Sequence, residues 1–250
     1  MALREVLALF LAQNQAVDDI FYSTTPPGAA LQWLAAGHID IGNLRLSVRP
    51  DVLIGPPPVL ERAVASGHLA TYQPFMRSRG AALLVMKGNP KGILGAADLL
   101  RDGVRLFLSN PLTEKVSYGI YRGALQGLAA AEGESLRFLE HEPGLLDPAK
   151  LCYGEAIHHR EAPQALADGR ADVAVVFYHL ALRYQRIFPE LFDFVRPAAW
   201  VQDEAAGIGR TDCGLVGDGG AWGHALLDFL ATEAVTQIYR THGLERCGPR

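Results

Sequence analysis

Polar side chains suited to binding an anion gather where apolar, strand-like runs give way to helix-like runs. They are Ser23-Thr24-Thr25, the stretch from Ser109 and Asn110 to Ser117, and His158-His159-Arg160-Glu161. A helix N-terminus presents unpaired N–H groups and about half a positive charge, and adjacent hydroxyl groups add further donors. Helix capping alone would also account for each junction taken singly. The anion interpretation depends on several junctions meeting beyond the carboxyl ends of strands.

The paired histidines raise a second possibility, a metal site. Adjacent residues in an extended segment point to opposite faces, so His158 and His159 do not chelate one ion easily. One of them could act with Glu155 or Glu161, but the sequence has no HExxH or other zinc spacing. A hydrogen-bonding histidine at a cleft edge and a purely structural one are the alternatives.

Other catalytic and cofactor signatures are missing from the sequence. It contains no GxSxG elbow and no Walker phosphate loop. The glycine-rich stretch GIGRTDCGLVGDGG lacks the GxGxxG spacing, and we interpret it as loop and strand. The three cysteines, Cys152, Cys213 and Cys247, are odd in number and show no CxxC spacing. We therefore expect no cofactor and no catalytic thiol.

Short apolar runs alternate with helical runs along the chain. The expected strands are residues 20–23, 51–55, 81–86, 104–108, 172–178 and 192–195. The expected helices are residues 29–36, 58–66 and 96–100, a helix after Pro111, and residues 222–241. Thr25 and Asn110 are predicted N-caps, with Pro26 and Pro111 at the first helical positions. This alternation predicts an α/β fold with mixed, mostly parallel sheets.

Length and charge exclude several classes of protein. At 250 residues the chain forms one large domain or two lobes. Its 49% hydrophobic and 20% charged residues are an ordinary globular balance, and its net charge of −4 argues against a nucleic-acid binder. No apolar run approaches the roughly 20 residues of a membrane-spanning helix, so we expect no direct membrane insertion.

Four stretches together resemble the type II periplasmic solute-binding proteins, and within them the molybdate- and tungstate-binding branch of ABC-importer binding proteins. They are DVLIGPPPVLERAVASGHL, LLVMKGNPKGILGAADLL, IHHREAPQALADGRADVAVVFYHLAL and AWGHALLDFLATEAVTQIYRTHGL. The KGNPKGI segment is the closest match, and the four occur in the family's order. The resemblance spans nearly the whole chain.

The resemblance implies a two-lobed fold with two crossover strands. The first lobe would hold residues 1–80 and 196–250 and the second residues 86–190, with hinges near 81–86 and 191–196. The family's ligand lies in the cleft between the lobes and is held by strand-to-helix loops of both. By motif, Thr24 and Thr25 match the family's hydroxyl loop, Ser117 falls near a backbone-donating turn, and Phe177 stands where many molybdate binders have tyrosine.

These motifs and junctions together define the predicted ligand-binding residues. Lys115 and Arg160 would offset the charge of an anion, with a solvated surface position as the alternative for both. The full set is Ser23, Thr24, Thr25, Asn110, Glu114, Lys115, Ser117, His158, His159, Arg160, Phe177 and Tyr178.

The start of the chain departs from the family pattern. ALREVLALFLAQ resembles the family's first helix, and Arg4 followed by Glu5 and a short apolar run makes a poor signal peptide. We therefore expect the family's first strand, one ligand loop and a signal peptide to be missing from this sequence. The resemblance implies a periplasmic or extracellular location, with a cytoplasmic one as the alternative.

The sequence thus predicts a non-catalytic receptor for a small oxyanion of the molybdate, tungstate or sulfate kind. Its partners would be that ligand and the membrane permease of an ABC importer. A metal-ion binder of the same fold, using His158 or His159 with Glu114 or Glu161, is the first alternative. An intracellular ligand-sensing domain and an enzyme on the same scaffold are the others.

Overall fold

The chain forms two compact units in the computed structural model, which describes residues 2–139, 149–202 and 209–248. Unit 1 consists of Met1–Arg77 and Arg210–Arg250, and unit 2 of Ser78–Gly209. The predicted α/β class with mixed sheets is confirmed. The segments expected to act as hinges, 81–86 and 191–196, belong to unit 2, because both contribute strands to its sheet.

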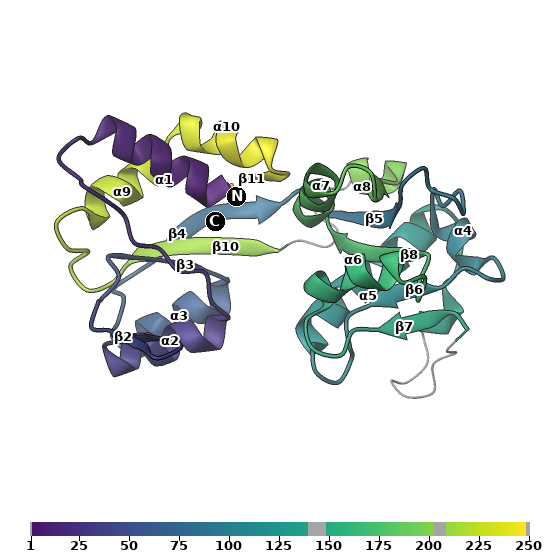
Figure 1. Cartoon of the computed structure of the whole chain (residues 1–250), viewed down its shortest axis with the longest axis horizontal. Helices are drawn as coiled ribbons and strands as arrows, with labels where there is room; N and C mark the ends of the chain where they lie inside the picture. The colour runs from purple at the N-terminus through teal and green to yellow at the C-terminus, as the bar shows by residue number, and fades with distance from the viewer. Residues whose placement is uncertain (1, 140–148, 203–208, 249–250) are drawn as a thin grey trace. The chain divides into compact units, whose positions relative to one another are not determined.

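A five-stranded sheet lies at the centre of unit 2 (Figure 1). Its order is β7-β6-β8-β5-β9, with β5 (Ala81–Met86), β6 (Leu106–Leu108), β7 (Leu151–Tyr153), β8 (Val173–Phe177) and β9 (Phe192–Val195). β6 runs parallel to β7 and β8, whereas β5 runs antiparallel to β8 and β9. The carboxyl ends of β6, β7 and β8 therefore lie at one edge of the sheet.

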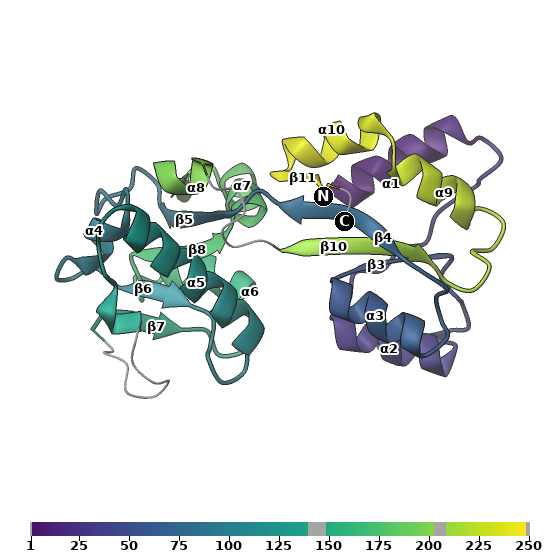
Figure 2. The same cartoon turned by 180° about the vertical axis from the view of Figure 1, so that it is seen from behind.

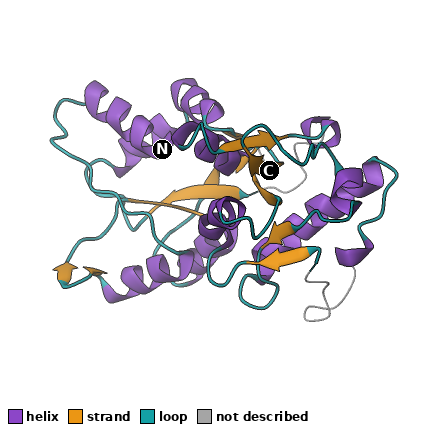
Figure 3. Ribbon diagram, turned by 45° about the vertical axis from the view of Figure 1, so that its right-hand side comes forward, coloured by secondary structure: helices purple, strands orange, loops and turns teal. Residues whose placement is uncertain are grey.

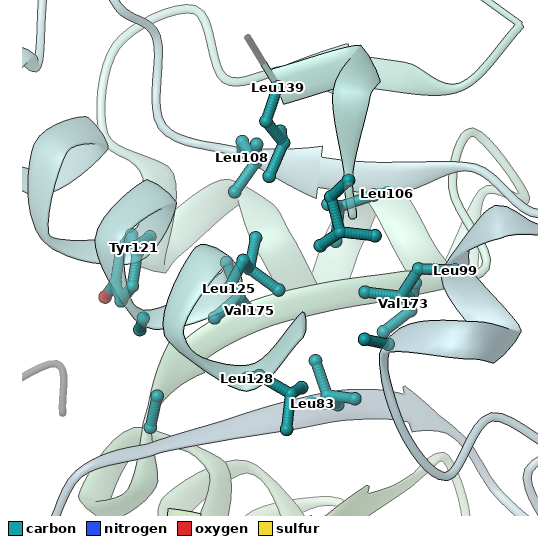
Figure 4. Packing of buried hydrophobic residues seen from close by; sticks show 14 of the residues in the cluster. Leu83, Leu99, Leu106, Leu108, Tyr121, Leu125, Leu128, Leu139, Val173 and Val175 are labelled. Carbon is teal, nitrogen blue, oxygen red and sulfur yellow. The ribbon is translucent and has the colours of Figure 1, made fainter. Parts of the chain in front are cut away.

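Helices cover both faces of this sheet, because alternate strand residues point to opposite sides. The helices are α4 (Ala96–Leu100), α5 (Lys115–Ala131), the 3-10 helix η1 (Arg137–Leu139), α6 (His158–Ala167), α7 (Tyr178–Ile187) and α8 (Ala198–Gln202). α4, α5 and α8 pack on one face, and α6 and α7 on the other. Figure 4 shows Leu125 and Leu128 of α5 lying among buried strand residues such as Leu83.

Unit 1 contains a four-stranded sheet in the order β11-β4-β10-β3. The strands are β3 (Val52–Gly55), β4 (Gln73–Ser78), β10 (Arg210–Leu215) and β11 (Leu244–Arg246). β10 runs antiparallel to β3 and β4. A separate hairpin is formed by β1 (Ile39–Ile41) and β2 (Leu44–Leu46), and Gly42 in its turn has a φ of 61°, a value that glycine adopts without strain.

The helices of unit 1 also lie on both faces of its sheet (Figures 1 and 3). α1 (Ala2–Gln13), α9 (Gly223–Leu230) and α10 (Glu233–Thr241) enclose one apolar cluster around Phe75 and Met76. α2 (Pro27–Ala36) and α3 (Pro57–Ala65) enclose a second around Leu60 and Leu69.

Several elements match the sequence prediction, and two predicted elements are wrong. The strand at 81–86 and the helix at 96–100 are confirmed residue for residue. The predicted strand at 20–23 is not formed, and Phe21 and Tyr22 there are exposed, because strand-forming residues need a neighbouring strand to pair with. The predicted helix 222–241 is divided in two, because the Thr232 hydroxyl caps α10 by accepting from the Val235 N–H.

Both predicted N-caps are also wrong. α2 begins at Pro27, so Pro26 takes the cap position and Thr25 makes no capping hydrogen bond. α5 begins at Lys115, later than predicted, because the Asn110 side chain accepts from the Leu112 N–H at 2.9 Å and caps a turn instead.

Among the described residues, no helix combines the length and the apolar character that crossing a bilayer requires.

Removing buried volume from the core of unit 2 should destabilise the protein. Leu125 is completely buried, so Leu125→Ala should lower the free energy of unfolding by about 3 kcal/mol through lost transfer energy and the cavity left behind. Leu94 is 66% exposed, and Leu94→Ala is the matched control, with an expected change below about 0.5 kcal/mol. Urea unfolding followed by circular dichroism measures both, and equal losses would contradict this packing.

Candidate functional site

Three helices begin at the carboxyl edge of the unit 2 sheet (Figures 1 and 2). α5, α6 and α7 follow β6, β7 and β8, whose ends share this edge. The first N–H groups of each helix have no acceptor within the helix, so the edge carries three sets of donors. Every predicted ligand-binding residue of unit 2 lies on these loops and first helical turns: Asn110, Glu114, Lys115, Ser117, His158, His159, Arg160, Phe177 and Tyr178.

The N-terminus of α6 is closed by a carboxylate of its own first turn. Glu161 accepts hydrogen bonds at 2.6–2.8 Å from three successive main-chain N–H groups, those of Glu155, Ala156 and Ile157. Partial burial opposes ionisation of the Glu161 carboxyl group, but these three donors outweigh it and lower its pKa. The main-chain donors of the loop that leads into α6 are thus satisfied by the protein itself.

Glu114 and Asn110 join the loops before α5 and α6. The Asn110 amide nitrogen donates to the Gly154 carbonyl at 3.1 Å, and the His158 N–H donates to Glu114 Oε2 at 2.9 Å. The Glu114 N–H donates in turn to the Asn110 carbonyl. The two loops therefore hold each other in position.

The N-terminus of α5, in contrast, is open. The main-chain N–H groups of Lys115, Val116 and Ser117 donate no hydrogen bond to any residue in the described part of the chain. Residues 112–117 line a hollow of about 340 Å³. Three predicted ligand-binding residues, Glu114, Lys115 and Ser117, thus share one hollow with three available donors.

Buried polar side chains at the same edge lack partners. Ser109, which follows β6, is completely buried, and His158, the first residue of α6, is 1% exposed. Neither the Ser109 hydroxyl nor either ring nitrogen of His158 makes a hydrogen bond of normal geometry with a described residue. Leaving such a group unsatisfied costs about 1–3 kcal/mol, so these buried groups reduce the stability of this edge.

His158 sits in an aromatic stack. Its ring lies 5.3 Å from the ring of Phe107 and 4.8 Å from that of Tyr121. Burial lowers the pKa of His158 to about 4, helped by nearby His159 and opposed in part by the main chain of Phe107 and by Glu161. His158 is therefore neutral at pH 7, and its burial favours the structural alternative over a metal ligand or a solvent-facing binding residue.

His159 and Arg160 are exposed on the first turn of α6. The His159 carbonyl accepts a hydrogen bond from the Tyr184 hydroxyl of α7. Partial burial of the ring lowers the pKa of His159, the positive charges of Arg160 and Arg183 lower it further, and the charge of Glu114 opposes them. These arginines provide positive charge next to the α6 N-terminus.

Phe177 and Tyr178 have packing roles at the end of β8. The Phe177 ring lies 5.0 Å from Tyr121 and stacks on His179 at 5.6 Å. Tyr178 lies beneath the Arg196 guanidinium, whose central carbon is 4.1 Å from the ring centroid, a cation–π contact. Both rings are engaged by protein neighbours.

His179 and Ser78 form a polar pair that the sequence did not predict. The Ser78 hydroxyl donates to the Gly80 carbonyl at 3.0 Å, so it accepts from His179 Nδ1 at 3.2 Å. Burial lowers the pKa of His179 to about 4, with further contributions from His159 and Arg183. No motif marks this pair, because the sheet alone brings its two distant segments together.

The hydroxyl loop Ser23-Thr24-Thr25 belongs to unit 1. Ser23 and Thr24 are exposed, Thr25 is half-buried, and no described residue hydrogen-bonds to their side chains. Their participation in ligand binding stays a prediction.

The described residues contain no group of three or more His, Cys, Asp or Glu side chains arranged to hold a metal ion. Glu161 and Glu114, the carboxylates named in the metal alternative, accept main-chain N–H groups. No observation in the described part of the chain favours that alternative.

A family model described as Bacterial extracellular solute-binding protein matches residues 1–245. No curated protein matches the sequence.

Solved structures share the fold at low sequence identity. The sulfate-binding protein SubI from Mycobacterium tuberculosis is 19% identical, with a TM-score of 0.64 over 99% of this chain and 83% of that one. The periplasmic molybdate-binding protein of Azotobacter vinelandii is 15% identical, with a TM-score of 0.55 over 100% and 95%. The spermidine/putrescine transporter protein PotD from Streptococcus pneumoniae is 13% identical, with a TM-score of 0.59 over 96% and 78%. At such identities these likenesses show the fold alone.

Acidification should destabilise the protein through His158. Its pKa is about 4 in the folded chain and about 6.5 when unfolded. The unfolded state therefore binds more protons between these values, and stability falls as the pH drops from about 6.5 towards 4, by up to about 3 kcal/mol. His158→Phe keeps an aromatic ring in the stack and removes this titration.

Urea unfolding at several pH values between about 7 and 4.5 should show a shallower loss of stability in His158→Phe than in the wild type. Part of the decline should persist in the variant, because His179 also has a pKa of about 4. Parallel curves for the two proteins would show that His158 does not titrate as its burial requires.

Proposed function

The chain belongs to the family of bacterial extracellular solute-binding proteins, and from that membership we propose that it is a receptor for a small oxyanion. The family binds small ligands and works with the permeases of ABC importers. In this proposal the chain captures the anion outside the cytoplasmic membrane and delivers it to such a permease. No bond of the ligand is made or broken.

The open N-terminus of α5 carries the proposal. Three main-chain N–H groups, those of Lys115, Val116 and Ser117, lie at a hollow without an acceptor among the described residues. α5 runs from Lys115 to Ala131, long enough to place its full partial positive charge of about one half at this end. The ammonium group of Lys115 and the hydroxyl of Ser117 are available beside these donors.

The neighbouring helix start supports the same chemistry. The loop that leads into α6 binds a negative group, the Glu161 carboxylate, through the N–H groups of Glu155, Ala156 and Ile157. An oxyanion at α5 would make the equivalent contacts with a group from outside the chain. Ser23, Thr24 and Thr25 are the proposed hydroxyl donors of unit 1.

The fold by itself does not select an anion. Among the structural neighbours are proteins named for sulfate, molybdate and spermidine/putrescine, which differ in the sign of their charge. The choice of an anion for this chain therefore rests on the helix N-terminus, on Lys115 and on the hydroxyl groups.

A thermal-shift panel tests the function directly. The probes are sulfate, phosphate, molybdate and tungstate, each at a constant ionic strength. An anion present at 100 times its Kd stabilises the protein by about 2.7 kcal/mol, which raises the midpoint by about 5–10 °C for a chain of this length. If no small anion shifts the midpoint, the oxyanion proposal is wrong.

Removing one main-chain donor should weaken binding without unfolding the protein. Val116 is 78% exposed in the first turn of α5, where proline is tolerated although it has no N–H. Val116→Pro should weaken binding of the most stabilising anion by about tenfold or more, because a hydrogen bond to a charged group contributes about 1.5–3 kcal/mol.

Val116→Ala keeps the N–H group and serves as the matched control. Isothermal titration should find its affinity within about twofold of the wild type. Equal weakening in the proline and alanine variants would mean that the Val116 N–H does not contact the ligand.

A further inference from the structure

A cluster of polar side chains lies between α5 and β7, the strand at one edge of the unit 2 sheet (Figure 2). Tyr118 and Arg122 are four residues apart on α5, so they share one face of the helix. Tyr153 is the last residue of β7. Its ring centroid is 6.4 Å from that of Tyr118, with the two planes at 65°. The cluster thus joins the helix to the outer strand of the sheet.

The polar atoms of this cluster are buried without hydrogen-bond partners. The Tyr118 side chain is 7% exposed, and Arg122 and Tyr153 are half-buried. The hydroxyl groups of Tyr118 and Tyr153 and Nε of Arg122 are all shielded from solvent, and none of the three makes a hydrogen bond of normal geometry with a described residue. Buried polar groups in folded proteins nearly always have a partner, so three of them in one cluster point to a shared one.

These three groups are donors at neutral pH. Burial raises the pKa of Tyr153, and the neighbouring Tyr118 raises it further, while the positive charge of Arg122 opposes the rise. The Tyr153 phenol therefore keeps its proton, and a guanidinium N–H can only donate. No carboxylate of a described residue forms an ion pair with Arg122. The cluster therefore combines hydrogen-bond donors with an uncompensated positive charge.

Such a combination favours a small anion as the shared partner. A negative charge against the half-buried guanidinium offsets the cost of removing it from water, whereas a water molecule brings no charge. A monatomic anion has no preferred direction of approach, so it can accept from a helix and a strand at once. Because the three polar atoms are closed off from solvent, a single-atom ion fits them better than a carboxylate or a tetrahedral oxyanion attached to bulk solvent.

We propose that unit 2 binds a chloride ion between the hydroxyl groups of Tyr118 and Tyr153 and Nε of Arg122. The ion fastens α5 to the edge strand β7 and is a resident part of the fold. This site involves side chains on the inner face of α5 and none of the main-chain N–H groups of Lys115, Val116 and Ser117. The inference is therefore independent of the proposed oxyanion function.

Bromide locates the ion directly, because it is a halide of similar size that scatters X-rays anomalously. Crystals of the full chain soaked in sodium bromide should show an anomalous peak between the three side chains. If bromide peaks occur only on the protein surface or not at all, the chloride site is wrong. This measurement needs no substitution.

Chloride should also stabilise the protein in solution. When sodium gluconate is replaced by sodium chloride at constant ionic strength, the melting midpoint should rise with chloride concentration and level off. At ten times the Kd the rise should be about 3–6 °C for a chain of this length. A midpoint that does not depend on chloride would contradict the proposal.

The variant Tyr153→Phe removes one donor and keeps the ring. In gluconate its midpoint should equal or exceed that of the wild type, because a buried hydroxyl without an acceptor contributes no stability. In chloride the order should reverse, because the variant loses most of the response. Tyr239→Phe is the matched control, since Tyr239 is buried in unit 1 at 8% exposure, and its variant should keep the full response.

Val116→Pro separates this site from the start of α5. It removes a main-chain donor of the proposed oxyanion site and leaves the cluster intact, so its midpoint should still rise with chloride as in the wild type. If the chloride response is lost in Val116→Pro and kept in Tyr153→Phe, the ion lies at the helix start and the proposed site is wrong. The oxyanion titrations remain a separate test in either case.

Discussion

Unit 2 places the N-termini of three helices at one edge of its sheet. The first main-chain N–H groups of these helices need acceptors from elsewhere, and this need constrains the whole edge. Because β6 runs parallel to β7 and β8, the N-termini of α5, α6 and α7 all come to the same edge. Their first N–H groups have no helical acceptor. At α6 the His158 N–H donates to the Glu114 carboxylate, and at α7 the Tyr178 N–H reaches the Gly80 carbonyl. At α5 the N–H groups of Lys115, Val116 and Ser117 remain available within the described part of the chain, which gives this edge a position for a group from outside the chain.

A row of aromatic rings holds these helix starts together without using charge. Ring centroids 4.8–5.6 Å apart lead from Phe107 to His158, Tyr121, Phe177 and His179, so the row joins β6, α6, α5, β8 and α7. Both histidines in the row have their pKa lowered to about 4 by burial, and they therefore pack as neutral rings at pH 7. Stacked rings in a dense interior move little relative to one another. The open donors of α5 are thus attached to a rigid support, while the charged groups lie at the surface of the hollow.

Sequence patterns predicted those parts of unit 2 that depend on local composition. The continuous apolar run at 81–86 is a buried strand, and the residues that follow β6 carry polar side chains of the edge, as predicted, whereas β7 was not among the expected strands. The start of α5 could not be predicted, because the Asn110 side chain could cap either a helix or a turn. It caps the turn at Leu112, and its amide nitrogen is held by the tertiary contact with the Gly154 carbonyl. The His179–Ser78 pair depends on strand register alone. Glu161 had a recognisable signal, an acid in the first turn of a helix, but the sequence does not show that three N–H groups converge on it.

A fold shared by proteins named for sulfate, molybdate and spermidine/putrescine cannot set the charge of the ligand. A shared fold places the backbone in a similar way, so selectivity has to come from the side chains that it carries. In this chain those side chains have opposite signs, Lys115 beside Glu114 on consecutive residues of one turn. A purely basic hollow would attract any anion in proportion to its charge. A carboxylate beside the ammonium group reduces that attraction. The signs and positions of these two side chains, in addition to the helix dipole, therefore set the electrostatic character of the hollow.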